Sequence, residues 1–231
     1  MSKILDQDDN YTYEILQDKD CVECATFLAH TFTKDNPYEI FMKTTFEQFF
    51  PDALALCQGI VSTNLSVIAR HKQTNQIDGI IQGIDLNTPD DEEDSTADTD
   101  AGGEKRADPI LQLIHQSKED YIKEYEKTHG ELKQNSVAHI LMVGVRSDCH
   151  GKGLASKLNQ VFLDHIRRQG FKHVIVDTTS AAIQHIYVTK LKGTVFKSVH
   201  APTFITKNTN GDEYRPLEHF DSNVLLVVID L

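Results

Sequence analysis

The stretch from Ile140 to Ala155, ILMVGVRSDCHGKGLA, constrains the fold more than any other part of the chain. Its opening apolar run continues through Gly144 to Val145, too short for a helix and too continuous for a half-exposed strand, which predicts a buried central strand. Gly151 and Gly153 follow a short polar link. The apolar residues after them share one helical face: Leu154, Leu158, Val161, Phe162, His165 and Ile166. The predicted order is strand, glycine loop, helix.

This order has a chemical meaning. The first turn of a helix leaves backbone N–H groups unpaired at the positive end of the helix dipole, so small residues there let a phosphate approach the backbone. The sequence His-Gly-Lys-Gly-Leu-Ala has neither the Gly-Lys-[Ser/Thr] of a Walker loop nor the G-x-G-x-x-G of a dinucleotide fingerprint. A shorter phosphate-binding loop is therefore expected.

Residues His150 to Ala155 resemble the [Q/R]-x-x-G-x-[G/A] signature of the GNAT-type acetyl-CoA-dependent N-acetyltransferases, with His150 in place of Gln or Arg. The resemblance covers roughly residues 137–195 and is topological elsewhere. It implies an α/β (α+β) GNAT fold: a central mixed, mostly antiparallel sheet with a V-shaped splay between two parallel strands, and helices on both faces. It also implies acetyl-CoA as cosubstrate and no metal.

The resemblance assigns cofactor binding to the end of the central strand, the loop and the following helix. In the family, the backbone of the strand binds pantetheine and polarises the thioester carbonyl. The residues implied are Val143, Gly144, Val145, His150, Gly151, Lys152, Gly153, Leu154, Ala155, Ser156 and Ser180. Because histidine loses its charge near neutral pH whereas arginine does not, CoA binding is expected to weaken as the pH rises through the titration of His150.

Tyr187 matches the tyrosine of the family's N-x-x-A-x-x-x-Y pattern, with Ser180 for Asn and Ile183 for Ala. A tyrosine there protonates the thiolate as it leaves. The family usually has glycine four residues after the tyrosine, whereas Gly193 comes six residues after Tyr187. The acid role and simple core packing both stay open for Tyr187.

The general base is less defined. Residues 32–38, FTKDNPY, resemble a segment of the insect dopamine and arylalkylamine N-acetyltransferases that contains Glu-Pro, in which Glu is the proposed base. Asn36 stands at that position, and an amide cannot accept a proton. Asp35, or His139 acting through water, are the catalytic candidates. Without either, an amine that is already neutral or bulk water suffices.

Charge and cysteine content limit the partners and the cellular compartment that can be expected for this chain. The net charge is −12, and residues 85–108 carry ten acidic and two basic residues. An acidic surface disfavours nucleic acid and attracts cationic amines. The four cysteines are sparse, Cys21 and Cys24 share a helical face, and no apolar run suits a membrane span or a leader peptide. We expect a cytoplasmic monomer or homodimer without a membrane partner.

The remaining pattern predicts a single domain over 1–231, with a disordered acidic insertion at about 87–107. Strands are expected over 11–16, 65–70, 77–86, 173–177, 194–199 and 223–229. Helices are expected over 21–32, 45–59 with an interruption near Pro51, 109–130, and from a cap at 178–180 through 191.

The expected function is transfer of the acetyl group of acetyl-CoA directly to a primary amine of a small molecule, an arylalkylamine or a polyamine. Two alternatives stay open. One is a protein N-terminal or lysine acetyltransferase, and the other is a catalytically silent acyl-CoA-binding module, which the missing Glu and the displaced glycine after Tyr187 favour.

Overall fold

The computed structural model describes residues 3–88, 97–99, 105–207 and 211–231. The chain divides into two compact units. The first comprises residues 1–86, 134–174 and 230–231, and the second comprises residues 87–133 and 175–229.

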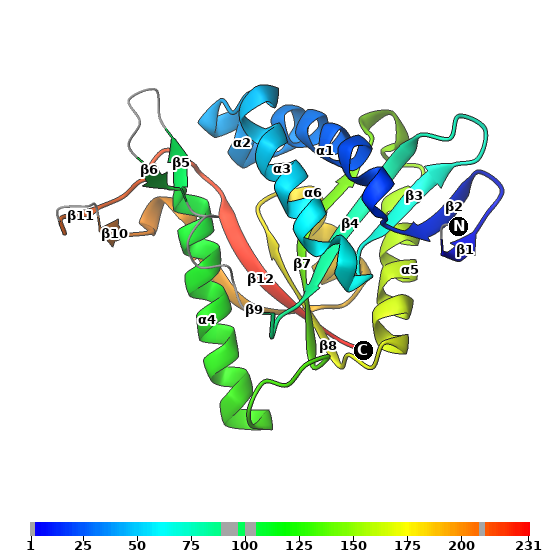
Figure 1. Ribbon diagram of the computed structural model, residues 1–231. Coiled ribbons are helices and arrows are strands. Elements are labelled where there is room, and N and C mark those ends of the chain that lie inside the picture. The colour runs from blue at the N-terminus through cyan, green and yellow to red at the C-terminus, as the bar shows by residue number, and fades with distance from the viewer. Residues whose placement is uncertain (1–2, 89–96, 100–104, 208–210) are drawn as a thin grey trace. The chain divides into compact units, whose positions relative to one another are not determined.

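The first unit combines an antiparallel sheet with helices (Figure 1). Its strands are β1 (Ile4–Gln7), β2 (Tyr11–Ile15), β3 (Val67–His71), β4 (Ile77–Asp85) and β7 (Val137–Val145). Its α-helices are α1 (Cys21–Asp35), α2 (Pro37–Met42), α3 (Phe46–Ile60) and α5 (Leu154–Arg168), and its 3-10 turns are η1 (Asp18–Asp20), η2 (Val61–Thr63) and η3 (Ser147–Cys149).

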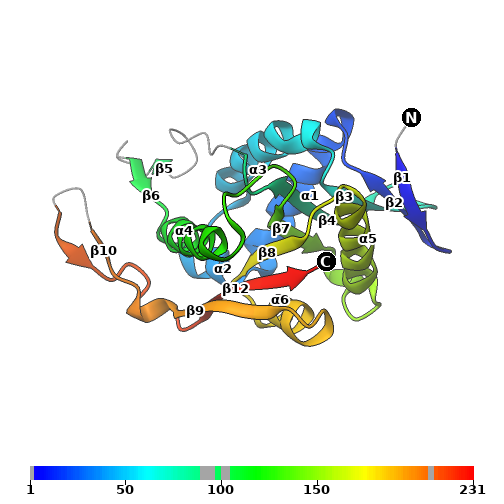
Figure 2. The ribbon, with the colours of Figure 1, turned by 90° about the horizontal axis from the view of Figure 1, so that it is seen from below.

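The strands of this unit follow the order β1-β2-β3-β4-β7, and each neighbouring pair is antiparallel. The predicted mostly antiparallel sheet is thus confirmed, although β1 was not foreseen. Helices α1 and α3 pack on one face of β3 and β4, and α5 packs on the other (Figure 2). Because helices cover both faces, β4 is buried along most of its length, including its polar residues Asp78, Gln82 and Asp85.

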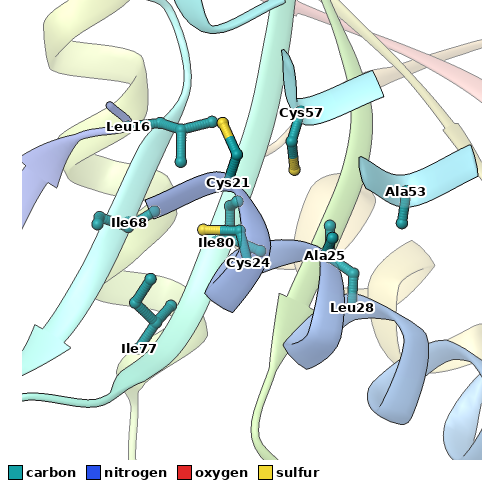
Figure 3. Packing of buried hydrophobic residues seen from close by; sticks show 10 residues of the cluster. All are labelled: Leu16, Cys21, Cys24, Ala25, Leu28, Ala53, Cys57, Ile68, Ile77 and Ile80. Atoms are coloured by element: carbon teal, nitrogen blue, oxygen red, sulfur yellow. The ribbon is translucent and has the colours of Figure 1, made fainter. Parts of the chain in front are cut away.

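Three cysteines lie in the core between α1, α3 and the sheet. Cys21 and Cys24 project from α1 and Cys57 from α3, and they meet Ile68 and Ile80 of the strands (Figure 3). Burial raises the pKa of the Cys57 thiol to about 12 and also raises that of Cys24. These thiols therefore act as small apolar core residues, as the shared helical face predicted.

Helix boundaries in the first half of the chain follow local capping, with one surprise. Asn36 begins α2, because its side-chain oxygen accepts hydrogen bonds from the N–H groups of Tyr38 (2.9 Å) and Glu39 (3.4 Å). The predicted interruption near Pro51 is wrong, since α3 runs unbroken through it. Proline removes a single helical donor, and burial of the inward face, which includes Ala53 and Cys57, keeps the helix continuous.

The second unit has its own strands and helices. Its strands β8 (His173–Thr178, of which the first two residues count with the first unit), β12 (Asn223–Asp230, of which the last counts with the first unit) and β9 (Thr194–His200) follow the order β8-β12-β9. Its helices are α4 (Pro109–His129) and α6 (Ala181–Gln184), followed by the π-helix η4 (His185–Lys190) and the 3-10 turn η5 (Ala201–Thr203). A short hairpin pairs β10 (Thr206–Lys207) with β11 (Glu213–Tyr214).

Helix α4 has the ends that its sequence predicts. Asp108 caps it by accepting a hydrogen bond from the N–H of Ile110 at 2.8 Å, and Gly130 ends it at a φ of 81°. Most of the insertion predicted to be disordered lies outside the described residues. Within it, β5 (Ala97–Thr99) pairs antiparallel with β6 (Lys105–Ala107). Across the described ranges, no helix is long and apolar enough to cross a bilayer.

Two glycines of β4 let α5 lie close to the sheet. A Cβ atom on Gly83 would stand 2.8 Å from Phe162 Cε2, and one on Gly79 would stand 3.1 Å from Leu158 Cδ2. Glycine at these two positions therefore leaves room for the side chains of α5.

We predict that Gly83→Ala lowers the free energy of unfolding by about 1–3 kcal/mol, because Phe162 is fully buried and has little room to move. Urea titration measures this change. Gly59→Ala is the matched control, since nothing lies within 4 Å of a Cβ there and alanine favours the helix by about 0.5–1 kcal/mol. Equal stability of the two variants would contradict the packing argument.

Candidate functional site

The central strand β7 ends at the residues that sequence analysis assigned to the cofactor. Val143, Gly144 and Val145 pair with Ile81, Ile80 and Gly79 of β4, respectively. Gly144 lies tightly under α1, because a Cβ atom there would stand 3.1 Å from Phe27 and 3.3 Å from Leu28. The backbone at the end of β7 is thus fixed by the sheet and by a helix.

A β-bulge interrupts β7 just before these residues. Gln82 pairs with Met142, whereas the next residue of β4, Gly83, pairs with Ile140, so Leu141 is the extra residue. A bulge bends a strand, increases its twist and changes the direction of its backbone groups. The register shifts at Gly83 of β4, whereas Leu141 is as apolar as its neighbours and does not mark the bulge in the sequence.

The loop after β7 takes the conformation that a phosphate-binding loop needs. Gly151 and Gly153 have φ values of 74° and 85°, which side chains rarely tolerate, and nothing lies within 4 Å of a Cβ atom placed on either. Helix α5 begins immediately after the second glycine. The first backbone hydrogen bond that closes its first turn runs from the Lys157 N–H to the Gly153 carbonyl at 3.0 Å.

The N–H groups of Leu154, Ala155 and Ser156 therefore precede the first α-helical hydrogen bond, at the positive end of a 15-residue helix. Lys152 is exposed between the two glycines. Open space at the glycines, first-turn amides and an exposed cation fit a pyrophosphate group. These are the residues predicted from the sequence for that purpose.

His150 is exposed, but its ring is already engaged. Its Nε2 atom lies 3.1 Å from the carbonyl oxygen of Val145. A carbonyl only accepts, so Nε2 carries the proton and the other ring nitrogen stays available. The side chain thereby links the start of the loop to the end of β7. This contact was not predicted.

An open pocket of about 450 Å³ borders the loop within the first unit. Its wall combines the turn between β1 and β2 with the start of α5. Asp8 supports that turn, because it accepts hydrogen bonds from the N–H groups of Asn10 (2.9 Å) and Tyr11 (2.8 Å) and from the Tyr13 hydroxyl (2.7 Å). Lys157 on α5 forms an ion pair with Asp6 of β1.

The two candidate bases occupy very different environments. Asp35 is the last residue of α1 and is exposed, whereas His139 is buried on β7, with 5% of its surface exposed. Asn36, which stands where the resembled enzymes have Glu, has its side-chain oxygen engaged as the cap of α2. The capping role explains the Asn without any chemical function.

Ser180 and Tyr187 belong to the second unit. Ser180 caps α6, because its hydroxyl oxygen accepts a hydrogen bond from the Ile183 N–H at 3.3 Å. Tyr187 is fully buried, and its hydroxyl has no hydrogen-bond partner among the described residues. Burial raises the pKa of the Tyr187 phenol, so the phenol stays protonated at physiological pH.

The π-helix η4 contains Tyr187 and the three residues after it. Within it, the Leu191 N–H donates to the Ile186 carbonyl at 2.9 Å, five residues back. The Gly193 N–H then donates to the Tyr187 carbonyl at 2.9 Å. A Cβ atom on Gly193 would stand 2.6 Å from Val227 Cγ1 of β12, so this position requires glycine. The widened helix was not foreseen, because its spacing reads as an ordinary helix in the sequence.

Comparison with known proteins identifies the same segment. Residues 121–190 match the model of the acetyltransferase (GNAT) family. This range contains β7, the loop, α5, β8, α6 and η4. A comparison with curated protein sequences finds no match.

Solved structures share the fold. A mosquito arylalkylamine N-acetyltransferase-like protein, 5b, has a TM-score of 0.72 at 16% identity, over 96% of this chain and 100% of that chain. An apo agmatine N-acetyltransferase mutant has a TM-score of 0.71 at 18% identity, with the same coverage. The yncA protein of Salmonella typhimurium, with its cofactor acetyl-CoA, has a TM-score of 0.54 at 15% identity, over 96% and 95%.

The α/β GNAT fold and the resemblance to GNAT-type acetyltransferases are thus confirmed, and the acyltransferase class is that of the family whose model residues 121–190 match.

We predict that Gly153→Ala weakens CoA binding by about five- to thirtyfold, because the new side chain strains the loop by about 1–2 kcal/mol and projects beside the first-turn amides. Titration calorimetry measures the dissociation constant. Gly130→Ala is the matched control, since Gly130 also has positive φ with open space around it but ends α4. Equal CoA affinity in the two variants would contradict the assignment of the loop.

Proposed function

We propose that this chain, whose residues 121–190 carry the GNAT acetyltransferase segment, transfers the acetyl group of acetyl-CoA to a primary amine of a small molecule, an arylalkylamine or a polyamine-like amine. The observation that carries the proposal is the backbone of the phosphate loop: two positive-φ glycines in open space at the start of α5. The fold shared with an arylalkylamine N-acetyltransferase-like protein and an agmatine N-acetyltransferase supports the acceptor class.

The residues that would hold the cofactor are the loop and the end of β7. The N–H groups of Gly151 and of residues 153–156 would bind the pyrophosphate, with the Lys152 side chain adding a positive charge. The backbone of Val143, Gly144 and Val145 would bind the pantetheine arm and polarise the thioester carbonyl, as the resemblance implies. Ser180 already caps α6, so any contribution from it would come from its backbone.

When bound, acetyl-CoA supplies an acetyl thioester, from which transfer to the amine forms an amide bond and breaks the bond to sulfur. Two proton movements balance the reaction, since the amine nitrogen loses a proton and the sulfur gains one. The protein needs one group for each movement, or can leave the first to solvent. Tyr187 is the proposed acid, and burial keeps its phenol protonated.

We predict that Tyr187→Phe lowers kcat by about a hundredfold without weakening CoA binding. The substitution should leave the free energy of unfolding unchanged or raise it by up to about 1 kcal/mol, because it removes a buried hydroxyl without a hydrogen-bond partner among the described residues. Steady-state kinetics and thermal unfolding measure the two effects. Unchanged kcat would leave Tyr187 with core packing alone.

Asp35 and His139 are the proposed alternatives for the base. We predict that replacing the true base, by Asp35→Asn or His139→Gln, lowers kcat/KM at pH 7 by about a hundredfold. The loss should shrink as the pH rises, because a growing fraction of the amine is then neutral without help. A pH profile of each variant measures this. If both variants match the wild type at every pH, solvent takes the proton.

The acidic composition supports a cationic acceptor, because a net charge of −12 attracts amines. We also propose a cytoplasmic location, which four free cysteines support. We propose that the protein is a monomer or a homodimer.

The deciding experiment is thiol release from acetyl-CoA against arylalkylamines, polyamines and short peptides, beside calorimetric titration with CoA. Turnover with small amines supports the proposal and names the acceptor. Turnover with peptides alone would replace it by protein acetylation. CoA binding without turnover would favour a silent module, which Asn36 as a helix cap also permits, and absence of CoA binding would reject the proposal.

A further inference from the structure

A second β-bulge lies at the start of β4, beneath the phosphate loop. Ala69 pairs with Gly79, whereas the next residue of β3, Arg70, pairs with Ile77, so Asp78 is the extra residue. Bulges change the direction of a side chain and are frequent beside functional sites. Here the bulge carries a carboxylate with only 6% of its surface exposed. A buried acid of this kind requires partners.

The partners of Asp78 come from both sides of the loop. Its Oδ1 atom lies 2.9 Å from Nε of Arg146, the residue that follows β7. Its Oδ2 atom accepts a hydrogen bond from the Tyr11 hydroxyl of β2 at 3.3 Å and lies 3.9 Å from the Cys149 sulfur. The Tyr11 hydroxyl and the Cys149 sulfur are themselves 3.5 Å apart. One carboxylate thus joins a strand to two loop residues.

Backbone contacts connect these partners to the amides of the loop. The Arg146 N–H donates to the Asp78 carbonyl at 2.9 Å, and the Cys149 N–H donates to the Arg146 carbonyl at 2.9 Å. The Lys152 N–H donates to the Cys149 carbonyl at 3.3 Å. The turn that leads into the glycines is therefore built on the two residues whose side chains meet Asp78.

Cys149 serves this network as a thiol. Burial raises its pKa, and the Asp78 and Asp148 carboxylates also disfavour the thiolate. Burial likewise raises the pKa of the Tyr11 phenol, with Cys149 and Asp78 adding to the effect. Arg146 is thus the cation that offsets the Asp78 charge, and the Tyr11 hydroxyl is a neutral donor. Removing the carboxylate would leave Arg146 without this ion-pair partner and the Tyr11 hydroxyl without its carboxylate acceptor.

We propose that Asp78 is a positioning residue for the phosphate loop: it does not touch the cofactor, but it holds Arg146 and Cys149 so that the amides after Gly151 converge on the pyrophosphate. The proposal rests on acetyl-CoA as the cosubstrate, as proposed above. The proposal predicts that replacing Asp78 weakens binding of the nucleotide end of CoA. The same replacement should not change the reaction of an acetyl donor that lacks the nucleotide.

The loss of the Asp78 charge would by itself strengthen CoA binding, which is opposite to the effect expected from a displaced loop. Neutralising Asp78 leaves Arg146 with the Asp148 carboxylate alone, 3.9 Å from its Nε atom, so the local charge becomes more positive, which would attract phosphate and tighten CoA binding. Salt distinguishes the effect of charge from the effect of loop position. Exposed charges are screened over about 3 Å at 1 M ionic strength, so the charge effect on CoA affinity weakens, whereas the effect of a displaced loop remains. Measurements at low and high salt therefore distinguish loop position from charge.

The test compares Asp78→Asn with wild type in two assays. We expect the dissociation constant for CoA, measured by calorimetry, to rise about tenfold at both salt concentrations. The kcat/KM for S-acetylpantetheine, which lacks the pyrophosphate and the nucleotide, should stay within about twofold. Unchanged or tighter CoA binding would overturn the proposal, and so would equal losses with both ligands.

Asp85→Asn is the matched control. Asp85 is the last residue of the same strand, is 8% exposed, and accepts a hydrogen bond from the Asn135 N–H at 2.6 Å, far along β4 from the loop. The Asp85→Asn substitution should change the stability of the protein but not its affinity for CoA. A weaker CoA affinity in this control variant would overturn the proposal. If Asp78→Asn does not fold, Tyr11→Phe removes one donor to Asp78 and should weaken CoA binding in the same direction. Wild-type protein that binds no CoA would instead reject the proposed function.

Discussion

The close packing of α5 on β4 is the constraint on which the candidate site depends. Phe162 and Leu158 occupy space that side chains at Gly83 and Gly79 would fill, so the helix can lie in one position on the strand. That position determines where the first turn of α5 presents its amides. The same strand β4 carries Asp78, whose side chain contacts the loop residues Arg146 and Cys149. A phosphate-binding surface made only of backbone thus gains its precision from apolar packing, which is non-directional by itself but leaves little free volume.

The elements that the sequence predicted well are those in which local and long-range preferences agree. Helix α5 has a one-sided apolar pattern and glycines at both ends, and α4 has a capping Asp108 and a terminal Gly130, so their limits follow from residues inside the segment. Pro51 was misleading because the buried face of α3 outweighs the loss of one donor. The bulges at Asp78 and Leu141 depend on pairing between strands, which periodicity does not record, and the spacing of the π-helix η4 reads as an ordinary helix in the sequence.

For the candidate site, the sequence indicated the strand, loop and helix whose backbone would bind the cofactor. It did not indicate the side-chain contacts that hold the loop in place. The glycines were identifiable because the chemistry of phosphate binding limits which residues can stand there. The network of Tyr11, Asp78 and Cys149 was not, because its members are far apart in the chain and none belongs to a motif. The base stays unassigned for a related reason: Asp35 and His139 differ in burial, and neither environment by itself marks a proton acceptor.

The π-helix has a consequence for how this segment tolerates changes of length. Tyr187 is held by complete burial, and Gly193 is held by β12, which leaves no room for a side chain. The residues between these two anchors are stored as a wider helical turn instead of a protruding loop. A helix with i to i+5 hydrogen bonds holds more residues in a turn than an α-helix does, so it can hold additional residues between two anchors without a loop. Sequence distance between motif residues is then a poor measure of whether a motif has been lost.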